Sequence, residues 1–428
     1  NALERVCATQ YMEEGRPADV PGIEMPDLIP HNEDLVHVLD VLCAGGYGAW
    51  VVGGSVRDCI LGKIPTDYDI CTDATPKQVI ESFDETIPTG ERFGTITVKS
   101  GKSMFEVTTL RVESDYGDGR RPDAVEWGNS LSVDLSRRDF TMNSMAYDYA
   151  RGLLHDPYNG KVDLDSGKLR AVGEAKQRLS EDGLRIMRAY RFMDRQEKGI
   201  WYPDNELSSA LIDNRAMLGL VSIERVWSEL ERIIVGKNAH IVLSRMNDDG
   251  VLSAIFGYPF AKDIFDFIRK LPEDLEARAA MLFTYLKGSE VSTILNRFKC
   301  SNKIIGRTKL LHFLLHNTPE KNDLRIYRNQ LGAEVNTHIC LMDAIGADTS
   351  NLVKSLDYPT DIVCLIDGVW LMTKTGLGPG IKLGRLKDWL FRIQIERGYT
   401  DLSQLETALC TVSWTYGDPK EWPRPKWP

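Results

Sequence analysis

Apolar and polar residues along the first 155 positions follow patterns that predict both strands and helices. Residues 33–46 have helical spacing and end in Gly45-Gly46, which is typical of a helix terminus. Short apolar runs follow, and two of them flank Ser100-Gly101 as in a β-hairpin. This part of the chain is therefore expected to be mixed α/β. The predicted strands are residues 49–52, 68–71, 95–98 and 105–110.

Beyond about residue 175 the strand patterns fade and helical periodicity dominates. Residues 1–30, by contrast, show little periodicity and are expected to form a partly irregular extension. The final WPRPKWP is expected to be extended, because proline disrupts helices. The predicted helices are residues 176–198, 205–218, 222–235, 238–247, 260–270, 275–286, 290–299, 302–316, 320–330, 360–375, 382–396 and 401–411.

Composition narrows the class of protein. The 428 residues predict roughly two to four domains, and 43% apolar with 27% charged residues is typical of a soluble globular protein. The eight cysteines show no CxxC pair and no zinc-type spacing, which favours free thiols. No apolar run is long enough to span a bilayer, and the first residues lack the pattern of a secretory signal. We therefore predict a cytoplasmic protein without a membrane partner.

The net charge of −10 argues weakly against nucleic-acid binding. Net charge averages over the whole chain, however, whereas a phosphate backbone responds to charges within about 10 Å. The distribution of charge therefore has to be examined segment by segment.

Residues 53–58, GGSVRD, follow the buried strand and begin a predicted helix. A tight glycine turn at a helix N-terminus presents backbone N–H groups that can hold phosphate. Arg57 adds a planar set of donors. An ordinary strand–helix turn is the alternative, and the motif alone supports the two interpretations equally.

Asp67 and Asp69 stand at the start of the second predicted strand. Residues two apart on a strand face the same side, so their carboxylates repel each other unless a cation lies between them. Mg²⁺ suits such oxygen ligands and can join a nucleoside triphosphate to an attacking hydroxyl. A solvated surface turn is the alternative, but GGSVRD just upstream favours the metal site.

The segment LSRRDFTMN contains Arg138 and Asp139. Asp139 can accept hydrogen bonds from ribose hydroxyls, and Arg138 can bind phosphate or a base. The alternative is a capped helix with an internal ion pair, in which Asp139 or Thr141 is the N-cap. The segment by itself favours that alternative.

In EDGLRIMRAYRFMDR, acidic and basic side chains are expected to cluster on one helix, because residues three and four apart are neighbours. An amphipathic helix with internal salt bridges is the alternative, which the excess of arginine over acid disfavours. The candidates are Glu181, Asp182, Arg185, Arg188 and Arg191, with Arg195 further on.

Two weaker candidates remain. Asp115, Arg120 and Arg121 belong to the glycine-rich SDYGDGRRPD, which predicts a mobile loop. A basic stripe on a predicted helix can contact a nucleic-acid backbone by charge, although a solvated helix face explains it almost as well. The stripe comprises Lys299, Lys303, Arg307 and Lys309.

Together these motifs resemble the class II tRNA nucleotidyltransferases, that is, the bacterial-type CCA-adding enzymes and the related bacterial poly(A) polymerases. The residues that carry the resemblance occur in the family's order and cover roughly residues 35–235. LNRFKCSNK and GIKLGRLKDWL extend it more loosely. The closely matching segments are GGSVRDCILGKIPTDYDICT, FEVTTLRVESDYGDGRRPD, DLSRRDFTMNSMAYD, DPYNGKVDL, SEDGLRIMRAYRF and SIERVWSELERI.

The resemblance implies an α+β protein in which a nucleotidyltransferase head of the polymerase-beta type precedes all-helical parts. The implied parts are an N-terminal extension at 1–32, a head at 33–155, a base-reading neck at 156–236, a body at 237–340 and a tail at 341–428.

The resemblance also assigns roles to residues. Asp67 and Asp69 match the ligands of the catalytic Mg²⁺, and Gly54 and Arg57 match the residues that hold the triphosphate. The nucleotide and ribose contacts match Arg138 and Asp139, the base-reading motif matches Glu181, Asp182 and Arg185, and further nucleotide contacts match Arg188 and Arg191.

Other matches are structural. Asp156 and Gly160 match a spring-like element, and Glu229 matches a helix-stabilising motif of the neck. Two positions depart from the family, since Ser144 and Gly183 stand where alanine is usual. Within a helix, Gly183 is expected to cost about 1 kcal/mol and to make the base-reading segment more mobile.

The activity implied is template-independent addition of C, C and A to the 3′ end of tRNA, using CTP and ATP and releasing pyrophosphate. An A-adding enzyme, a CC-adding enzyme and a poly(A) polymerase are alternatives within the class. The RRP-containing loop after Arg111 argues against CC addition alone, and the mixed charge of the tail argues against a poly(A) polymerase. A catalytically inactive tRNA-binding protein is the alternative from another class. The sequence leaves the oligomeric state open.

Overall fold

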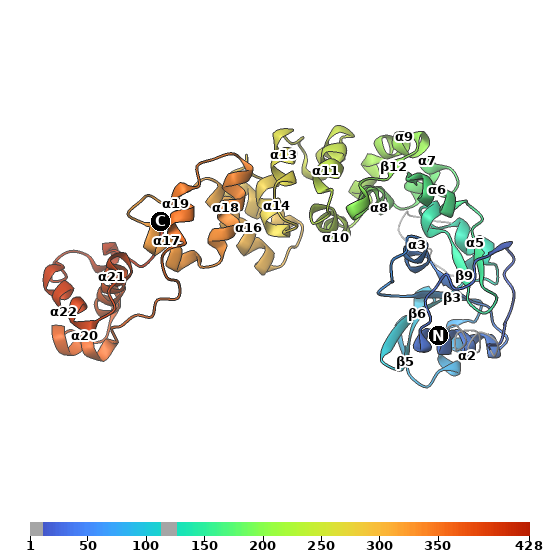
Figure 1. Ribbon diagram of the computed structural model, residues 1–428, viewed down its shortest axis with the longest axis horizontal. Coiled ribbons are helices and arrows are strands. Elements are labelled where there is room, and N and C mark those ends of the chain that lie inside the picture. Colours follow the sequence, from blue (N-terminus) through green and yellow to red (C-terminus); the bar gives the residue numbers. More distant parts are fainter. Residues whose placement is uncertain (1–11, 113–125) are drawn as a thin grey trace. The chain divides into compact units, whose positions relative to one another are not determined.

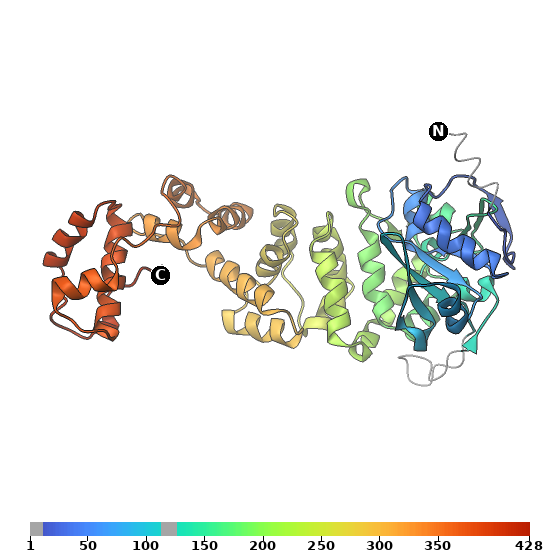
Figure 2. The same ribbon diagram turned by 90° about the horizontal axis from the view of Figure 1, so that it is seen from below.

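The computed structural model describes residues 12–112 and 126–428 and consists of two compact units, residues 1–259 and 260–428. The first unit contains a sheet followed by helices, and the described residues of the second contain helices and no strand (Figures 1 and 2). The α+β class expected from the sequence is confirmed. The finer division into extension, head, neck, body and tail stays a prediction.

An eight-stranded sheet forms the centre of the first unit, in the order β1-β10-β9-β2-β3-β6-β5-β4. Only β3 and β6 pair in parallel, and every other neighbouring pair in this sheet is antiparallel. The strands are β1 (Gly22–Glu24), β2 (Ala49–Val52), β3 (Asp69–Thr72), β4 (Thr86–Gly90), β5 (Thr95–Ser100), β6 (Ser103–Thr109), β9 (Ala146–Asp148) and β10 (Leu153–His155).

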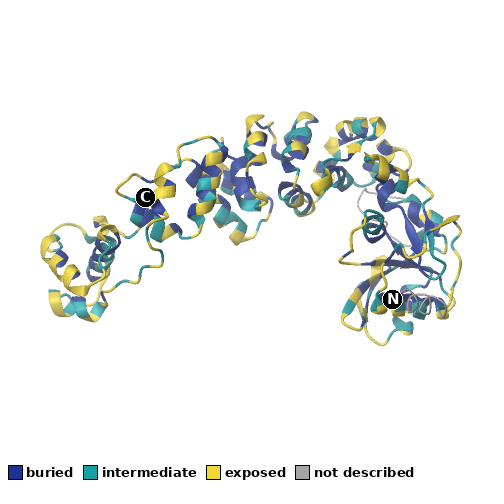
Figure 3. Cartoon of the chain, in the orientation of Figure 1, coloured by how far each residue is buried: buried dark blue, intermediate teal, exposed yellow. Residues whose placement is uncertain are grey.

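Two local sequence features account for parts of the sheet, namely an apolar run in β2 and a tight turn between β5 and β6. All four residues of β2 are buried, which explains its uninterrupted apolar run. β5 and β6 form the expected hairpin, with register pairs from Thr95–Thr108 to Ser100–Ser103 and with Gly101 in the turn. Buried positions accordingly line the strands (Figure 3). The helices α2 (Glu33–Ala44), α3 (Gly54–Ile60) and α4 (Pro76–Ser82) contact strands of this sheet.

The short edge strands were not found by sequence periodicity. β1 lies within the segment expected to be irregular, and its three residues are all exposed. It is a strand because Gly22, Ile23 and Glu24 pair with β10 at the end of the sheet. Three residues are too few to establish an alternating pattern, so only the pairing partner determines this strand.

The helices that complete the first unit differ from the expected ones at one important place. The helix expected over residues 176–198 is two helices, with Asp182 in an extended conformation and Gly183 between them. The helices are α5 (Leu131–Ser136), α6 (Gly160–Ser166), α7 (Ala175–Glu181), α8 (Leu184–Met193), α9 (Asn205–Asp213), α10 (Ile223–Ile234), α11 (Ala239–Asp248) and α12 (Val251–Phe256).

The break between α7 and α8 explains Gly183. The expectation that this glycine weakens a continuous helix is wrong, because it precedes α8 and packs against the 3-10 helix η4 (Arg215–Leu220). A Cβ added at Gly183 would lie 2.6 Å from the carbonyl oxygen of Met217. Glycine is therefore needed here for close backbone approach.

We predict that Gly183→Ala lowers the free energy of unfolding by about 1–3 kcal/mol, the usual cost of forcing atoms into a packed site. A glycine inside a helix would give the opposite result, a gain of about 1 kcal/mol. Urea denaturation of the two proteins distinguishes these outcomes by sign. Gly219→Ala is the control, because nothing lies within 4 Å of a Cβ built there.

The second unit is built from ten α-helices in residues 260–428, all of which the structure describes. WPRPKWP is non-helical, as expected, and its Trp427 is buried against the ring of Tyr327 at a centroid distance of 4.9 Å. The helices are α13 (Asp263–Arg269), α14 (Leu275–Leu282), α15 (Gly288–Arg297), α16 (Asn302–Leu315), α17 (Leu324–Leu331), α18 (Glu334–Ala344), α19 (Ser350–Ser355), α20 (Gly368–Thr375), α21 (Ile381–Arg397) and α22 (Leu402–Thr411).

Among the described residues, no helix is both long enough and apolar enough to cross a membrane. The cytoplasmic location stays a prediction from the sequence.

Candidate functional site

A charged recess in the first unit brings most of the candidate residues together. Its lining combines the Gly53–Gly54 turn, Asp69 and residues around the start of α8. Seven arginines against three aspartates make it suited to a polyanion such as a triphosphate. The lining residues are Gly53, Gly54, Arg57, Asp69, Arg137, Arg138, Asp139, Asn143, Asp182, Leu184, Arg185, Arg188, Arg191, Phe192 and Arg225.

The glycine turn forms one part of the lining. Gly53 has φ 73°, a left-handed value that favours glycine, and a Cβ there would lie 3.0 Å from a guanidinium nitrogen of Arg138. Arg57 follows on α3 and is held by Asp58 at 3.0 Å and by the Asn143 side-chain oxygen at 2.8 Å. The turn and its arginine are thus preformed rather than loosely placed.

Two other carboxylates, those of Glu106 and Asp67, act on Asp69 beside the recess. Asp69 begins β3 and is paired in register with Glu106 of β6. Burial raises the pKa of Asp69, the charge of Glu106 raises it further, Arg138 lowers it and Asp67 raises it. The carboxylate side chain is accessible to solvent, but the walls of the recess restrict its hydration. Such mutual repulsion is what a divalent cation relieves.

The strand-face argument for the two aspartates holds only in part. β3 begins at Asp69, so Asp67 lies in the irregular segment before the strand, where Thr66 Oγ1 donates to it at 3.1 Å. Asp67 does not line the arginine recess but a neighbouring pocket. The described residues contain no ready-made cluster of three or more metal-binding side chains. Mg²⁺ needs only one or two carboxylates together with phosphates, so Asp67 and Asp69 fit it.

Glu106 was not singled out in the sequence, although it lies in the matching segment FEVTTLR. Its exposed position between the buried Phe105 and Val107 on β6 was the available signal. The sequence pattern does not show that β6 pairs in parallel with β3. That pairing places Glu106 beside Asp69.

Arg138 and Asp139 are placed by separate ion pairs. Arg138 donates to Asp134 of α5 at 3.2 Å. Asp139 is 8% exposed and accepts from the backbone N–H of Phe140 at 2.8 Å. It is not the N-cap of the 3-10 turn that follows, Thr141–Asn143, whose N-cap position is Phe140. Burial, the largest single influence, would raise the pKa of Asp139. The charge of Arg188 and the hydrogen bonds from Arg188, Asn143 and the Phe140 N–H together outweigh it, so the pKa is lowered. Asp139 is therefore a buried anion that orients Arg188.

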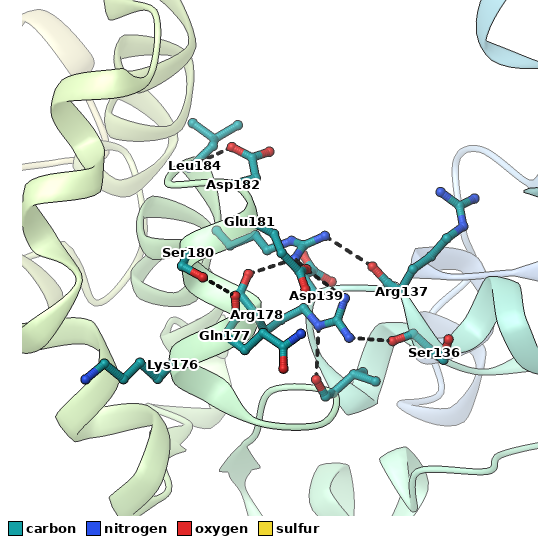
Figure 4. A network of polar contacts seen from close by, with 12 residues as sticks. Ser136, Arg137, Asp139, Lys176, Gln177, Arg178, Ser180, Glu181, Asp182 and Leu184 are labelled. Atoms are coloured by element: carbon teal, nitrogen blue, oxygen red, sulfur yellow. Dashed lines mark hydrogen bonds and ion pairs between the residues drawn. The ribbon is translucent and has the colours of Figure 1, made fainter. Parts of the chain in front are cut away.

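A network of polar contacts joins Arg178, Glu181 and Ser136 (Figure 4). Arg178 donates to Glu181 at 2.8 Å and to the carbonyl of Ser136 at 2.8 Å. Arg185 in turn pairs with the same Glu181 carboxylate and donates to the carbonyl of Arg137 at 3.1 Å. Glu181 does not itself line the recess, so it acts on the site by orienting Arg185.

Asp182 lies at the break between α7 and α8 rather than inside a helix. Its carboxylate accepts from the N–H of Leu184 at 3.0 Å and from Arg225 of α10 at 3.0 Å. The Asp182 carbonyl still accepts the N–H of Arg185 at 3.0 Å, so one turn joins the two candidates. Both side chains therefore reach the recess although the expected continuous helix is absent.

The arginines of α8 find acidic partners on other elements. Arg188 binds Asp139 at 2.6 Å, and Arg191 binds Glu229 of α10 at 2.6 Å. Both guanidinium groups also lie over the ring of Phe192, at 5.3 and 4.2 Å from its centroid. The excess of arginine within α8 is thus balanced by acids distant in sequence.

The remaining described candidates of the first unit, Asp156 and Ser144, make hydrogen bonds to the backbone of the fold. Asp156 caps α6 by accepting the N–H groups of Gly160 at 2.7 Å and Lys161 at 2.9 Å. Ser144 is fully buried, and its hydroxyl donates to the carbonyl of Leu135 at 2.6 Å, which accommodates the change from alanine. The loop candidates Asp115, Arg120 and Arg121 lie outside the described residues.

The basic stripe expected in the second unit is not formed by one helix. Lys299 lies after α15 with φ 56°, whereas Lys303, Arg307 and Lys309 are on α16. Arg307 is bound by acids of two other helices, and its pKa is raised by Asp274 and Glu334. The expected alignment of four cations is therefore wrong, because Arg307 joins helices within the unit. Lys303 and Lys309 are exposed.

Comparisons with known proteins agree with this fold. A family model described as the poly A polymerase head domain matches residues 49–170. A second model, described as the probable RNA and SrmB-binding site of polymerase A, matches residues 203–265. The fold and the charged recess therefore define a nucleotidyltransferase.

The most informative relatives are CCA-adding enzymes. That of Lactobacillus delbrueckii subsp. bulgaricus is 32% identical over 362 residues, covering 82% of this chain and 90% of the relative. That of Listeria innocua is 38% identical over 274 residues, covering 63% and 68%. This chain belongs to the family of the CCA-adding enzymes.

Solved structures support the assignment of the fold. The CCA-adding enzyme of Bacillus stearothermophilus in complex with CTP matches with a TM-score of 0.75 at 25% identity, covering 89% of this chain and 96% of the other. The Thermotoga maritima CCA-adding enzyme complexed with tRNA matches with a TM-score of 0.67 at 18% identity, covering 91% and 98%. The second likeness concerns the fold alone.

Proposed function

We propose that this chain adds C, C and A to the 3′ end of tRNA without a nucleic-acid template, using CTP and ATP. The observation that carries the proposal is the single recess in which Asp69, an array of arginines and the Asp182–Arg185 pair meet. Its relatives are named for CCA addition, and solved relatives were obtained with CTP, ATP and tRNA.

The proposed reaction is a nucleotidyl transfer. The 3′-oxygen of tRNA forms a bond to the α-phosphorus of the nucleotide, and the bond from that phosphorus to the bridging β-phosphate oxygen breaks. Pyrophosphate leaves, and the hydroxyl proton passes to solvent. Arg57, Arg138 and the Gly53–Gly54 turn would bind the triphosphate, which positions the α-phosphorus and offsets its charge.

Asp67 and Asp69 would hold Mg²⁺, and Glu106, which is paired in register with Asp69, would be the neighbouring carboxylate. When bound, the ion supplies positive charge beside the reacting phosphate and hydroxyl. The raised pKa of Asp69 supports this proposal, because burial and, after it, the charge of Glu106 disfavour the ionised carboxylate, and a bound cation would stabilise it.

Base selection is proposed for Asp182 and Arg185. A carboxylate and a guanidinium present fixed acceptors and donors, as the edge of a template base does. The Glu181–Arg178 network would maintain the direction of Arg185. The buried Asp139 would fix Arg188 at a nucleotide contact.

The decisive experiment uses purified protein, Mg²⁺ and α-labelled nucleotides on tRNA lacking its terminus, tRNA ending in CC, and an unstructured RNA. Complete CCA addition requires C, C and A on the first substrate and A on the second. Addition of C and C without A to the first substrate identifies a CC-adding enzyme. Addition of A only, and only to the tRNA that ends in CC, identifies an A-adding enzyme. Long A tails on unstructured RNA identify a poly(A) polymerase, and no product identifies an inactive tRNA-binding protein.

We predict that Arg185→Ala relaxes base choice. Loss of its hydrogen bonds should decrease discrimination against UTP and GTP by about 10- to 100-fold, since one good base contact contributes about 1–3 kcal/mol. Single-turnover rates with each of the four nucleotides measure this. Arg178→Ala is a comparison that removes contacts around Glu181 while keeping Arg185 itself, and its effect on base choice should be smaller. An equal loss of rate for all four nucleotides with Arg185→Ala would contradict a base-reading role.

A further inference from the structure

A separate cavity of the first unit adjoins the arginine recess. It has a volume of about 280 Å³ and is lined by residues of α3, of α8 and the segment after it, of α10 and of α11. Arg57, Arg191 and Phe192 line both the cavity and the recess. The guanidinium groups of Arg57 and Arg191 lie 5.2 and 4.2 Å from the centroid of the Phe192 ring. The cavity and the recess therefore share a wall.

The cavity is strongly basic, although the chain as a whole has a net charge of −10. Two acids line it, and the fold already engages both of them. Asp58 binds Arg57 at 3.0 Å, and Asp194 accepts from the backbone N–H of Asn238 at 2.9 Å and from its side-chain amide at 2.8 Å. Six cations against two acids leave a surplus of four positive charges. The cations are Arg57, Lys63, Arg191, Arg195, Lys198 and Arg232.

Four of these six cations form no ion pair with any residue that the structure describes. Arg191, by contrast, is bound by Glu229 at 2.6 Å. Burial lowers the pKa of Arg191, Glu229 raises it, and the charges of Arg188 and Arg232 lower it further. The surplus charge of the cavity is therefore not compensated from within the described parts of the chain. The four cations without an acidic partner are Lys63, Arg195, Lys198 and Arg232.

The side of the cavity that carries Arg195 and Lys198 is held in place by the fold. The guanidinium of Arg195 lies 5.0 Å from the centroid of the Trp201 ring, and its buried Nε has no hydrogen-bond partner among the described residues. The turn that contains Lys198 is closed because the backbone N–H of Arg195 donates to the carbonyl of Gly199 at 2.8 Å, and Asn238 donates to the same carbonyl at 3.1 Å. Such preformed donors lower the cost of ordering the site when a ligand binds.

We propose that this cavity binds inorganic pyrophosphate after it leaves the arginine recess. The inference rests on the proposed function, which releases one pyrophosphate with each nucleotide added. Pyrophosphate is a compact polyanion, so it fits a small cavity that has surplus positive charge and a donor without an acceptor. To leave the recess it has to give up contacts with arginines, and a cavity that shares Arg57 and Arg191 replaces those contacts in steps. The recess is then open to the next nucleotide.

A backbone phosphate of RNA is the other anion to be considered. RNA is usually bound along an extended basic groove that follows several phosphates in turn. A cavity of about 280 Å³ enclosed by segments of four helices instead suits one compact group. Free pyrophosphate is therefore favoured, and binding of RNA is one of the outcomes that the experiment distinguishes.

The test measures equilibrium binding of inorganic pyrophosphate to the full chain while the recess is filled. A CTP analogue in which a methylene group replaces the oxygen between the α- and β-phosphates fills the recess without reacting. We expect one pyrophosphate to bind per chain under these conditions. Lys198→Gln and Arg232→Gln should each weaken its binding about tenfold or more, the effect of losing one charged hydrogen bond. Affinity for the analogue should not change, because neither residue lines the recess.

Lys176→Gln is the matched control, because Lys176 is an exposed lysine of α7 that lines neither the cavity nor the recess. Complete competition between pyrophosphate and the analogue would overturn the inference, since the recess would then be the binding place of both. Cavity variants that bind pyrophosphate as well as Lys176→Gln does would overturn it too. A loss of tRNA affinity with unchanged pyrophosphate binding would show that the cavity binds RNA instead. Failure of the proposed function is distinguishable, because the unsubstituted protein would then extend no tRNA.

Discussion

Replacement of Asp69 by alanine is expected to decrease incorporation of both C and A by about a thousandfold or more, the effect of losing several kcal/mol of metal-dependent stabilisation. Asp69 begins β3, is paired in register with Glu106 and lines the arginine recess. Asp69→Asn should be equally inactive, because it keeps the size of the side chain and removes its charge. Single-turnover addition at saturating Mg²⁺ measures the effect.

Binding of tRNA is the accompanying measurement, since the variant should retain it. Asp84→Ala is the control, as Asp84 is an exposed aspartate of the same unit outside the recess. Near-full turnover by Asp69→Asn would show that the metal assignment is wrong. A loss of tRNA binding equal to the loss of turnover would instead indicate damage to the fold.

The parts of this fold that the sequence predicted are those determined by local patterns. β2 was found because all four of its residues are buried, and the β5–β6 hairpin because Gly101 closes two alternating strands. β1 could not be found in this way, since its exposed residues become a strand only through pairing with β10. The helix α18 was also missed, because valine, isoleucine and threonine within Glu334–Ala344 weaken its helical signal.

The candidate site shows the same division between local and distant information. GGSVRD identified a real turn, because the left-handed Gly53 and the following helix are encoded side by side. The break at Gly183 could not be predicted, since its cause is the carbonyl of Met217, more than thirty positions away. Roles for Gly54, Arg57 and the other recess residues are proposals, of which the Asp69 and Arg185 variants described above test two.

Partners of charged residues were the least predictable feature. Arg307 resembles a surface cation in the sequence, yet Asp274 and Glu334 reach it from two other helices. The arginines of α8 likewise exceed the acids around them in sequence, and Asp139 and Glu229 supply the balance from elsewhere. A count of charges along one helix therefore does not show which of them are available to a ligand.

The contact between Arg188 and Asp139 leads to a prediction about stability as well as activity. Arg188→Met should lower the free energy of unfolding at neutral pH by about 3 kcal/mol, because it leaves a buried carboxylate without its counter-charge. The same variant should lose nucleotide affinity, since Arg188 lines the recess. For stability, Arg225→Met is the matched control, because the side chains of Arg225 and Asp182 are 47% and 34% exposed and their ion pair should contribute no more than about 1 kcal/mol.

The pH dependence separates this cause from a general packing defect. In the unsubstituted protein the pKa of Asp139 is lowered, so its contribution to stability is present above the ordinary carboxyl pKa of about 4 and is lost as pH falls through the folded value. Without Arg188, burial would raise the pKa of Asp139, and protonation would then relieve the penalty. The difference in stability between the two proteins should therefore shrink as the pH is lowered.

Asp139→Asn added to Arg188→Met should restore much of the loss at neutral pH, and urea denaturation across pH measures both effects. A difference that is the same at every pH, with no recovery in the double variant, would show that Arg188 stabilises the fold by packing and not by its charge.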